Sequence, residues 1–197
     1  MPVAPLAYGQ PPRPATELSN TRKPNQYEAR THLCHRHAVG VVIVACELGH
    51  RHAFRHRSEW LEELKPDVLL FFNNDHANSI FFDFYSTFAI GISPTFELAD
   101  EGAGTRPLPP IKSNTNLAIC VAESLVNDEF DMTIFQDRPL DHGCHSPLCL
   151  LWPHQPDWPG TVVPIEVNVL QHPLPSALRC YKLGQAVVGP CTPIPRT

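Results

Sequence analysis

Two short polar clusters, each containing a histidine, are the residues of this chain best suited to chemistry. Asn73-Asn74-Asp75-His76 directly follows an apolar run at residues 68–72, and Leu140-Asp141-His142-Gly143 follows a second apolar segment. Neutral imidazole binds Fe, Zn, Cu or Ni, and a carboxylate beside imidazoles favours non-haem Fe(II) with open coordination positions. A histidine without a metal can instead act as a general base or bind a substrate hydroxyl. Residue types alone also allow both histidines to be loop residues that bond only to backbone groups.

Strands and helices alternate along the chain and are expected to position these clusters. Their apolar patterns predict a single α/β domain with a central mixed sheet flanked by helices. Reactive side chains collect beyond the carboxyl ends of strands in such sheets, so His76 and His142 should reach one cleft if both strands share a sheet. The predicted strands are 38–46, 68–72, 87–92, 132–135 and 161–170, and the predicted helices are 58–64, 114–127 and 176–187.

Individual residues within these elements make more specific predictions. Ser58 and Asn114 are expected to cap their helices, because their side chains can accept hydrogen bonds from the first turn. Pro164 favours a strand start or an edge strand, since proline cannot donate to the hydrogen-bond ladder. Residues 98–111 and 140–147 are predicted to be loops. The last predicted helix is expected to bury three apolar side chains, which are Leu178, Tyr181 and Leu183.

The distribution of proline predicts the boundaries of the domain. The chain contains 22 prolines in 197 residues, about twice the usual frequency of ~5%, and they concentrate at the two ends and in the loops. Residues 1–37 are predicted to form a disordered or atypical arm. Residues 38–187 are predicted to form the α/β domain, which we expect to be incomplete at its C-terminus. Residues 188–197 are a proline-rich tail.

Composition and charge exclude several classes of protein. The formal charge of −5 argues against a nucleic-acid-binding face, which would be basic. No apolar stretch approaches the length of about eighteen residues that a membrane helix needs, and the first residues lack the pattern of a secretory signal. Seven cysteines without a CxxC pair predict free thiols rather than a disulfide framework or a zinc ribbon. We therefore expect a cytoplasmic protein.

A histidine-rich patch lies before the first polar cluster. It comprises His32, His35, His37 and His50, with Cys34 and Cys46 close by. One hypothesis is a zinc-binding module built from these residues, although their spacing matches no standard zinc pattern. The alternative is a solvated patch beside the proline-rich arm.

Several further motifs lie in register along the chain with the two polar clusters. They include Phe88-Ala89-Ile90-Gly91-Ile92, Ala99-Asp100-Glu101-Gly102, Arg106-Pro107-Leu108-Pro109-Pro110 and Gln171-His172-Pro173-Leu174-Pro175. Together with Asn73-Asn74-Asp75-His76-Ala77-Asn78 and Leu140-Asp141-His142-Gly143, these motifs resemble the class III extradiol ring-cleavage dioxygenases. The resemblance is to the members that act on protocatechuate and gallate, and it covers about residues 60–186.

That resemblance implies a reaction and a set of site residues. It implies one Fe(II) bound by two histidines and a glutamate, with a catecholic aromatic acid and O2 as substrates and a ring-opened product. His76 matches the second iron-binding histidine, and His142 matches a pocket histidine near the substrate hydroxyls. Asn74 and Asp75 flank the ligand and could orient it. A small α subunit and a homo-oligomer are the partners that the resemblance suggests.

The chain departs from the family pattern toward both ends. The family's first iron-binding histidine lies before a Ser-His-x-Pro-like motif, and its glutamate ligand and a proton-transferring histidine lie in a later segment. None of these is recognisable here, and Glu166 does not match the glutamate. Two functions therefore stay open. One is extradiol cleavage of protocatechuate, gallate or a relative, and the other is an inactive family fragment that pairs with intact subunits or binds aromatic acids.

Overall fold

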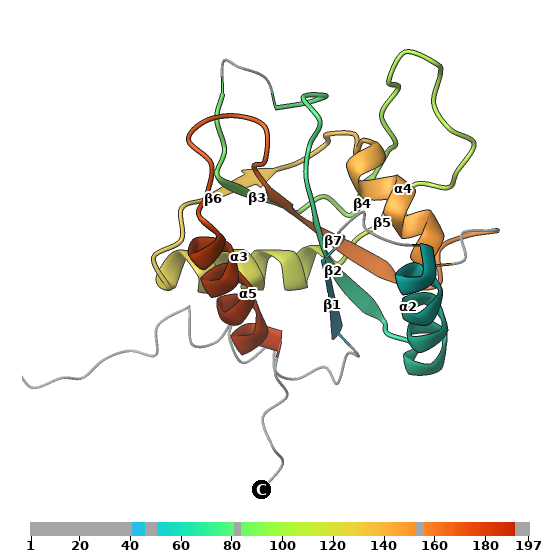
Figure 1. Cartoon of the computed structure of the whole chain (residues 1–197), viewed down its shortest axis with the longest axis horizontal. Coiled ribbons are helices and arrows are strands. Elements are labelled where there is room, and N and C mark those ends of the chain that lie inside the picture. Colours follow the sequence, from blue (N-terminus) through green and yellow to red (C-terminus); the bar gives the residue numbers. More distant parts are fainter. Residues whose placement is uncertain (1–40, 46–50, 81–83, 153–155, 192–197) are drawn as a thin grey trace, which may run out of the picture.

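A five-stranded mixed sheet forms the centre of the protein (Figure 1). The computed structural model describes residues 41–45, 51–80, 84–152 and 156–191, with side chains described from Ser58 onward. The strand order is β1 (Val41–Ala45), β2 (Val68–Asn73), β7 (Thr161–Val167), β3 (Phe88–Gly91) and β6 (Met132–Phe135). Only the contact between β7 and β3 is antiparallel. This sheet confirms the predicted α/β class.

Helices cover both faces of the sheet, as predicted. Helices α2 (Arg51–Leu64) and α4 (His142–Leu151) pack together on one face, and α3 (Thr115–Asn127) and α5 (Ala177–Cys191) pack together on the other (Figure 1). A small second sheet pairs β4 (Thr95–Phe96) with β5 (Ile111–Lys112). No helix among the described residues is long and apolar enough to cross a membrane.

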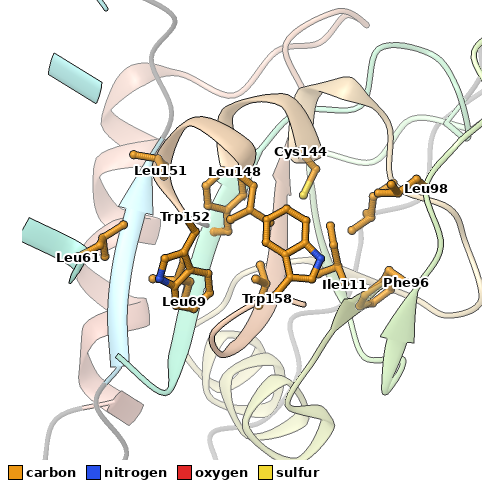
Figure 2. Close-up of a cluster of buried hydrophobic side chains, with 13 residues drawn as sticks. Leu61, Leu69, Phe96, Leu98, Ile111, Cys144, Leu148, Leu151, Trp152 and Trp158 are labelled. Atoms are coloured by element: carbon orange, nitrogen blue, oxygen red, sulfur yellow. The ribbon is translucent and has the colours of Figure 1, made fainter. Parts of the chain in front are cut away.

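Strand β2 is buried on both faces because its side chains alternate between two apolar cores. Leu69 and Phe71 pack in the core beneath α2 and α4 (Figure 2), and Val68 and Leu70 pack in the core beneath α3 and α5. The continuous apolar run of the sequence therefore reflects a central strand. It holds the polar residues that follow it at a fixed edge of the sheet.

Helix α3 agrees closely with its prediction. Asn114 caps it, accepting a hydrogen bond from the backbone N–H of Leu117 at 3.1 Å. The buried residues recur at helical spacing and face the second core. They are Ala118, Val121, Ala122 and Leu125.

Truncation of Leu125 should measure how much this helix contributes to stability. Leu125 is completely buried, so Leu125→Ala is expected to lower the free energy of unfolding by about 2–5 kcal/mol. The neighbouring Val126 is 55% exposed, and Val126→Ala should change it by less than about 0.5 kcal/mol. Urea unfolding followed by circular dichroism measures both changes. Equal effects of the two substitutions would show that α3 does not pack as described.

Two predictions about loops and strands are wrong. Residues 140–147 were expected to form a polar loop, but α4 begins at His142 and includes both Gly143 and Pro147, which usually favour loops. Pro164 lies in the central strand β7 rather than at a strand start or an edge. The pairing of β7 with β3 covers residues 165–167 of β7 and therefore stops before Pro164. Proline is tolerated at this position because its missing N–H disrupts no pairing with β3.

The outer helices also differ from prediction. Helix α2 begins at Arg51, so Ser58 lies within it rather than at its cap. Helix α5 continues to Cys191, and its Leu178 and Tyr181 are 63% and 64% exposed, whereas only Leu183 is buried as expected. Apolar residues on such a helix need not all face the core, since much of a protein surface is apolar.

One cysteine among the described residues departs from the prediction. Cys120, on α3, is disulfide-bonded, whereas Cys144, Cys149 and Cys180 are not part of a disulfide. The prediction that all seven cysteines are free is therefore wrong at Cys120. Pairing depends on two cysteines coming close in space, which their spacing along the chain does not reveal.

Candidate active site

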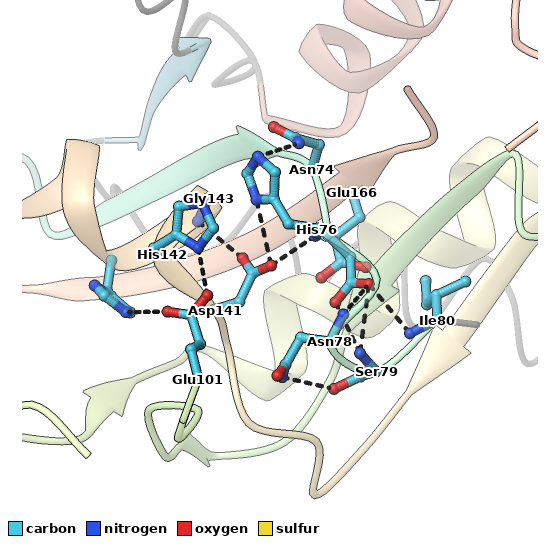
Figure 3. Close-up of polar contacts among 12 residues, drawn as sticks. Asn74, His76, Asn78, Ser79, Ile80, Glu101, Asp141, His142, Gly143 and Glu166 are labelled. Atoms are coloured by element: carbon cyan, nitrogen blue, oxygen red, sulfur yellow. Dashed lines mark hydrogen bonds and ion pairs between the residues drawn. The ribbon is translucent and has the colours of Figure 1, made fainter. Parts of the chain in front are cut away.

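The two polar clusters meet at the edge of the sheet where β2 ends (Figure 3). Asp141 joins them. Its Oδ2 accepts the backbone N–H of His76 at 2.6 Å, and its Oδ1 accepts the backbone N–H of Gly143 at 2.8 Å. One buried carboxylate therefore caps α4 and fastens the segment after β2 to the start of that helix.

The imidazole of His76 makes a hydrogen bond at Nε2 and lies beside a carboxylate at Nδ1. Its Nδ1 lies 3.3 Å from Oδ2 of Asp141, and its Nε2 lies 3.0 Å from the amide Nδ2 of Asn74. An amide nitrogen can only donate, so Nε2 carries the lone pair and Nδ1 carries the hydrogen; this N–H lies close to Asp141 but does not form a hydrogen bond with it. A carboxylate at one nitrogen is the usual support for a histidine that binds a metal through the other.

His142 forms a second carboxylate–histidine pair beside the first. Its ring stacks on that of His76, with centroids 4.1 Å apart and planes inclined by 18°. Its Nδ1 is hydrogen-bonded to Oε1 of Glu101, which comes from the loop between β4 and β5 (Figure 3). The side chain of His142 is 45% exposed, so a ligand can reach it from solvent.

Contacts with histidines lower the pKa of Glu101, and burial lowers the pKa of His145 behind it. Burial raises the pKa of Glu101, but its hydrogen bond to His142 and the nearby charges of His142 and His145 outweigh this and hold the pKa below 4.5. Burial, together with the charge of Arg106, lowers the pKa of the fully buried His145. The shifts in pKa therefore favour an anionic Glu101 beside a neutral His145.

The donor atoms fit a divalent metal. One ligand atom from each of His76, Asp141 and His142 lies within 4.8 Å of the other two, among the residues that the structure describes. Two imidazoles and a carboxylate are the donor set of many non-haem Fe(II) oxygenases. Both oxygens of Asp141 also accept backbone N–H groups, and the two imidazole rings are stacked. His76 and His142 each have a carboxylate beside Nδ1, which leaves Nε2 as the nitrogen of each ring that faces a metal or a substrate.

The two residues before His76 act differently. Asn74 contacts the imidazole directly. Asp75 does not contact the ring but accepts the backbone N–H groups of Asn78, Ser79 and Ile80 at 3.1–3.2 Å. It thus shapes the turn after His76, in which Ala77 adopts a left-handed conformation with φ of 58°.

Gly143 allows the two clusters to approach. A Cβ atom at this position would lie 2.3 Å from the carbonyl oxygen of Asn74 and 2.7 Å from Cε1 of His76. Real Cβ atoms do not approach backbone oxygen so closely, so a larger residue must displace the segment that carries His76.

Gly143→Ala should therefore weaken metal binding. We expect the affinity for Fe(II) to fall about 10- to 100-fold, the range seen when groups supporting a metal ligand are changed. Gly184→Ala on α5 is the matched control, because no atom lies within 4 Å of a Cβ at that position. Anaerobic titration calorimetry measures both affinities, and circular dichroism checks that each variant is folded. Unchanged affinity in Gly143→Ala would contradict the geometry described for His76.

Glu166 belongs to a buried ion-pair cluster rather than to the two carboxylate–histidine pairs. Its Oε1 pairs with Nη2 of Arg138, and Nη1 of Arg138 lies 3.7 Å from Oδ1 of Asp75. The guanidinium also stacks 3.9 Å from the ring centroid of Phe135. Glu166 and Asp75 line a pocket together with Gln171. Glu166 is thus paired with Arg138, and among the described residues it forms no ion pair with either carboxylate–histidine pair.

Glu166 should give the protein an unusual pH dependence of stability. Burial raises its pKa above 4.5 despite the opposing charge of Arg138. The folded protein therefore holds this proton more tightly than the unfolded chain, so the stability from Glu166 is present below pH 4.5 and is lost as pH rises through the raised pKa.

Glu166→Gln removes this titration. Unfolding by urea from about pH 4 to about pH 7 should show wild-type stability falling relative to the variant. Glu97→Gln, at an exposed position, should leave the wild-type slope unchanged. Parallel pH profiles for wild type and Glu166→Gln would contradict the raised pKa.

Sequence reasoning found His76, His142 and Asn74 but assigned no role to Asp141 or Glu101. A local signal for Asp141 existed, because an aspartate before a helix is a common cap. Glu101 belongs to one of the matching motifs, but it lies 41 residues before His142, and no local pattern connects them. The histidine-rich patch with His32, His35, His37 and His50, and Cys34 and Cys46, lies outside the described residues.

The family of the chain follows from comparison with known proteins. The family model of the catalytic LigB subunit of aromatic ring-opening dioxygenase matches residues 33–189. The chain belongs to this family. That membership confirms the resemblance predicted from the motifs around His76 and His142.

Individual relatives support the same assignment. A gallate dioxygenase from Pseudomonas putida is 51% identical over 90 residues, which cover 46% of this chain and 26% of that protein. A 2,3-dihydroxyphenylpropionate/2,3-dihydroxicinnamic acid 1,2-dioxygenase from Burkholderia vietnamiensis is 30% identical over 129 residues, covering 66% of this chain and 39% of that protein. One of the same name from Photorhabdus laumondii is 29% identical over 137 residues, covering 70% and 41%. The chain thus spans well under half the length of these relatives.

Proposed function

We propose that this protein catalyses Fe(II)-dependent extradiol cleavage of a catecholic aromatic acid, with O2 as the second substrate. The proposal rests mainly on the two carboxylate–histidine pairs stacked side by side at the edge of the sheet. Family membership supports the reaction class. The names of the relatives support an aromatic acid with adjacent hydroxyls, such as gallate, protocatechuate or 2,3-dihydroxyphenylpropionate.

The proposed role of His76 is to bind the metal through Nε2. Asp141 fastens the backbone N–H of His76 and places a carboxylate 3.3 Å from Nδ1. Asn74 donates to the same Nε2 lone pair that a metal would use, so its amide must turn aside when the metal binds. Bound Fe(II) would supply a site for both diol oxygens and for O2, which brings the two substrates together.

The proposed role of His142 is to move a proton. Its Nδ1 is engaged by Glu101, so Nε2 is the nitrogen that can accept a proton from a diol hydroxyl. Stacking on His76 places this imidazole next to the proposed metal ligand. His142 can therefore act on a hydroxyl of a diol held at His76 without being a ligand itself.

An assay with the full chain tests the proposal. Protein loaded with Fe(II) under anaerobic conditions is given gallate, protocatechuate or 2,3-dihydroxyphenylpropionate and then O2. We expect O2 uptake with formation of a ring-opened product from at least one acid. Absence of product, while the Pseudomonas putida gallate dioxygenase is active in parallel, would overturn the proposal. Binding of an acid without turnover would instead support the inactive, ligand-binding or subunit-pairing alternative.

A further inference from the structure

We propose that Glu101 is a positioning residue that fixes the tautomer and orientation of His142, so that Nε2 is always the nitrogen available to accept a proton. The catalytic consequence of this inference rests on the proposed function. The tautomer itself does not, because it is a property of the protein without metal or substrate.

The contact between the two side chains determines where the hydrogen lies. An ionised carboxylate can only accept, so the pairing of Oε1 with Nδ1 of His142 requires the hydrogen on Nδ1. The part of the chain that the structure describes gives Nε2 no hydrogen-bond partner. Glu101 therefore selects one of two tautomers that would otherwise interconvert.

The backbone around Glu101 is held in place on both sides. Before it, the N–H of Ala99 donates to the carbonyl of Leu140, and the N–H of Leu140 donates to the carbonyl of Glu97, both at 2.9 Å. After it, Oδ1 of Asp100 accepts the N–H groups of Gly102 and Gly104, both at 2.9 Å. The carboxylate is thus presented to α4 by a loop tied directly to the residue before Asp141.

The second oxygen of Glu101 faces another histidine of the same helix. Its Oε2 lies 3.7 Å from Nε2 of His145, one turn after His142. His145 is completely buried, and neither ring nitrogen has a hydrogen-bond partner within the described ranges. The carboxylate therefore sits between two imidazoles on one face of α4, which limits its rotation and strengthens its hold on His142.

Three variants distinguish a role of Glu101 in orienting His142 from a role in packing alone. Glu101→Gln keeps the shape of the side chain, but its amide can either accept from or donate to Nδ1, so it no longer selects a tautomer. Glu101→Asp keeps a carboxylate on a shorter stem. Glu97→Gln removes an exposed carboxylate from the same loop and is the control.

The test combines spectroscopy with kinetics. Long-range ¹H–¹⁵N spectra of the metal-free protein report the tautomer of His142, whose signals are identified by their loss in His142→Ala. We expect hydrogen on Nδ1 in wild type, Glu101→Asp and Glu97→Gln, and a mixture or the reverse in Glu101→Gln. In ring cleavage, kcat of Glu101→Gln should fall about 10- to 100-fold with little change in KM, and Glu101→Asp should recover part of the loss.

Two results would overturn the inference. One is hydrogen on Nε2 of His142 in wild type, and the other is a Glu101→Gln protein with the wild-type spectrum and kcat. If wild type cleaves no diol, the proposed function fails, while the spectra still decide the role of Glu101. If wild type is active but the spectra show no dependence on Glu101, only this inference fails.

Discussion

Replacing His76 by alanine is expected to abolish both metal binding and ring cleavage. The substitution removes the histidine that we propose as the metal ligand, whose Nδ1 lies 3.3 Å from Asp141 and whose Nε2 carries the lone pair. Loss of a ligand should exceed the 10- to 100-fold loss typical of supporting groups, so we expect Fe(II) affinity to fall more than about 100-fold. Anaerobic Fe(II) titration and O2 uptake measure the two effects.

An exposed histidine provides the control for this substitution. His172 lies on the surface between β7 and α5. His172→Ala should keep wild-type Fe(II) affinity and turnover. If His76→Ala bound Fe(II) as tightly as this control, the metal would have to be held elsewhere, and the proposed role of His76 would be wrong.

Replacing His142 by alanine is expected to separate binding from chemistry. General acid–base groups typically contribute about 100- to 10,000-fold to rate, and kcat should fall by a factor in that range. Iron affinity should stay at the wild-type level, because in our proposal His142 moves a proton and is not a ligand. Metal analysis and single-turnover kinetics on the same preparation measure both quantities.

Loss of iron from His142→Ala would show that His142 is a metal ligand. His142 belongs to the group of three donor atoms within 4.8 Å of one another. If His142→Ala lost its iron, the two rings would have to rotate out of their stacked arrangement to bind one metal together with Asp141. The role assigned to His142 from the family resemblance would then be wrong for this chain.

The sequence was sufficient for the elements with strong local patterns. The run before Asn73 is apolar throughout because β2 is buried on both faces, and helix α3 has a capping asparagine and a regular apolar stripe. Those elements placed His76 beyond the end of a strand. The start of α4 was missed because Gly143 and Pro147 are typical of loops, whereas the site needs Gly143 for close approach.

The remaining parts of the site depend on contacts between distant segments. Asp141 is 65 residues from His76, and Glu101 is 41 residues from His142. No periodicity or spacing reports such pairings, because they are set by which strands lie side by side. The position of Pro164 is a similar case, since its tolerance depends on where the pairing of β3 with β7 ends.

Oxygen incorporation in a single turnover tests the central claim most directly. Wild-type protein and His76→Ala are each loaded with Fe(II) and given the aromatic acid together with ¹⁸O2. Mass spectrometry then measures the masses of the products. We predict a ring-opened product carrying ¹⁸O from wild type and none from His76→Ala. An unlabelled or uncleaved acid from wild type, or the same labelled product from both proteins, would contradict an oxygenase centred on His76.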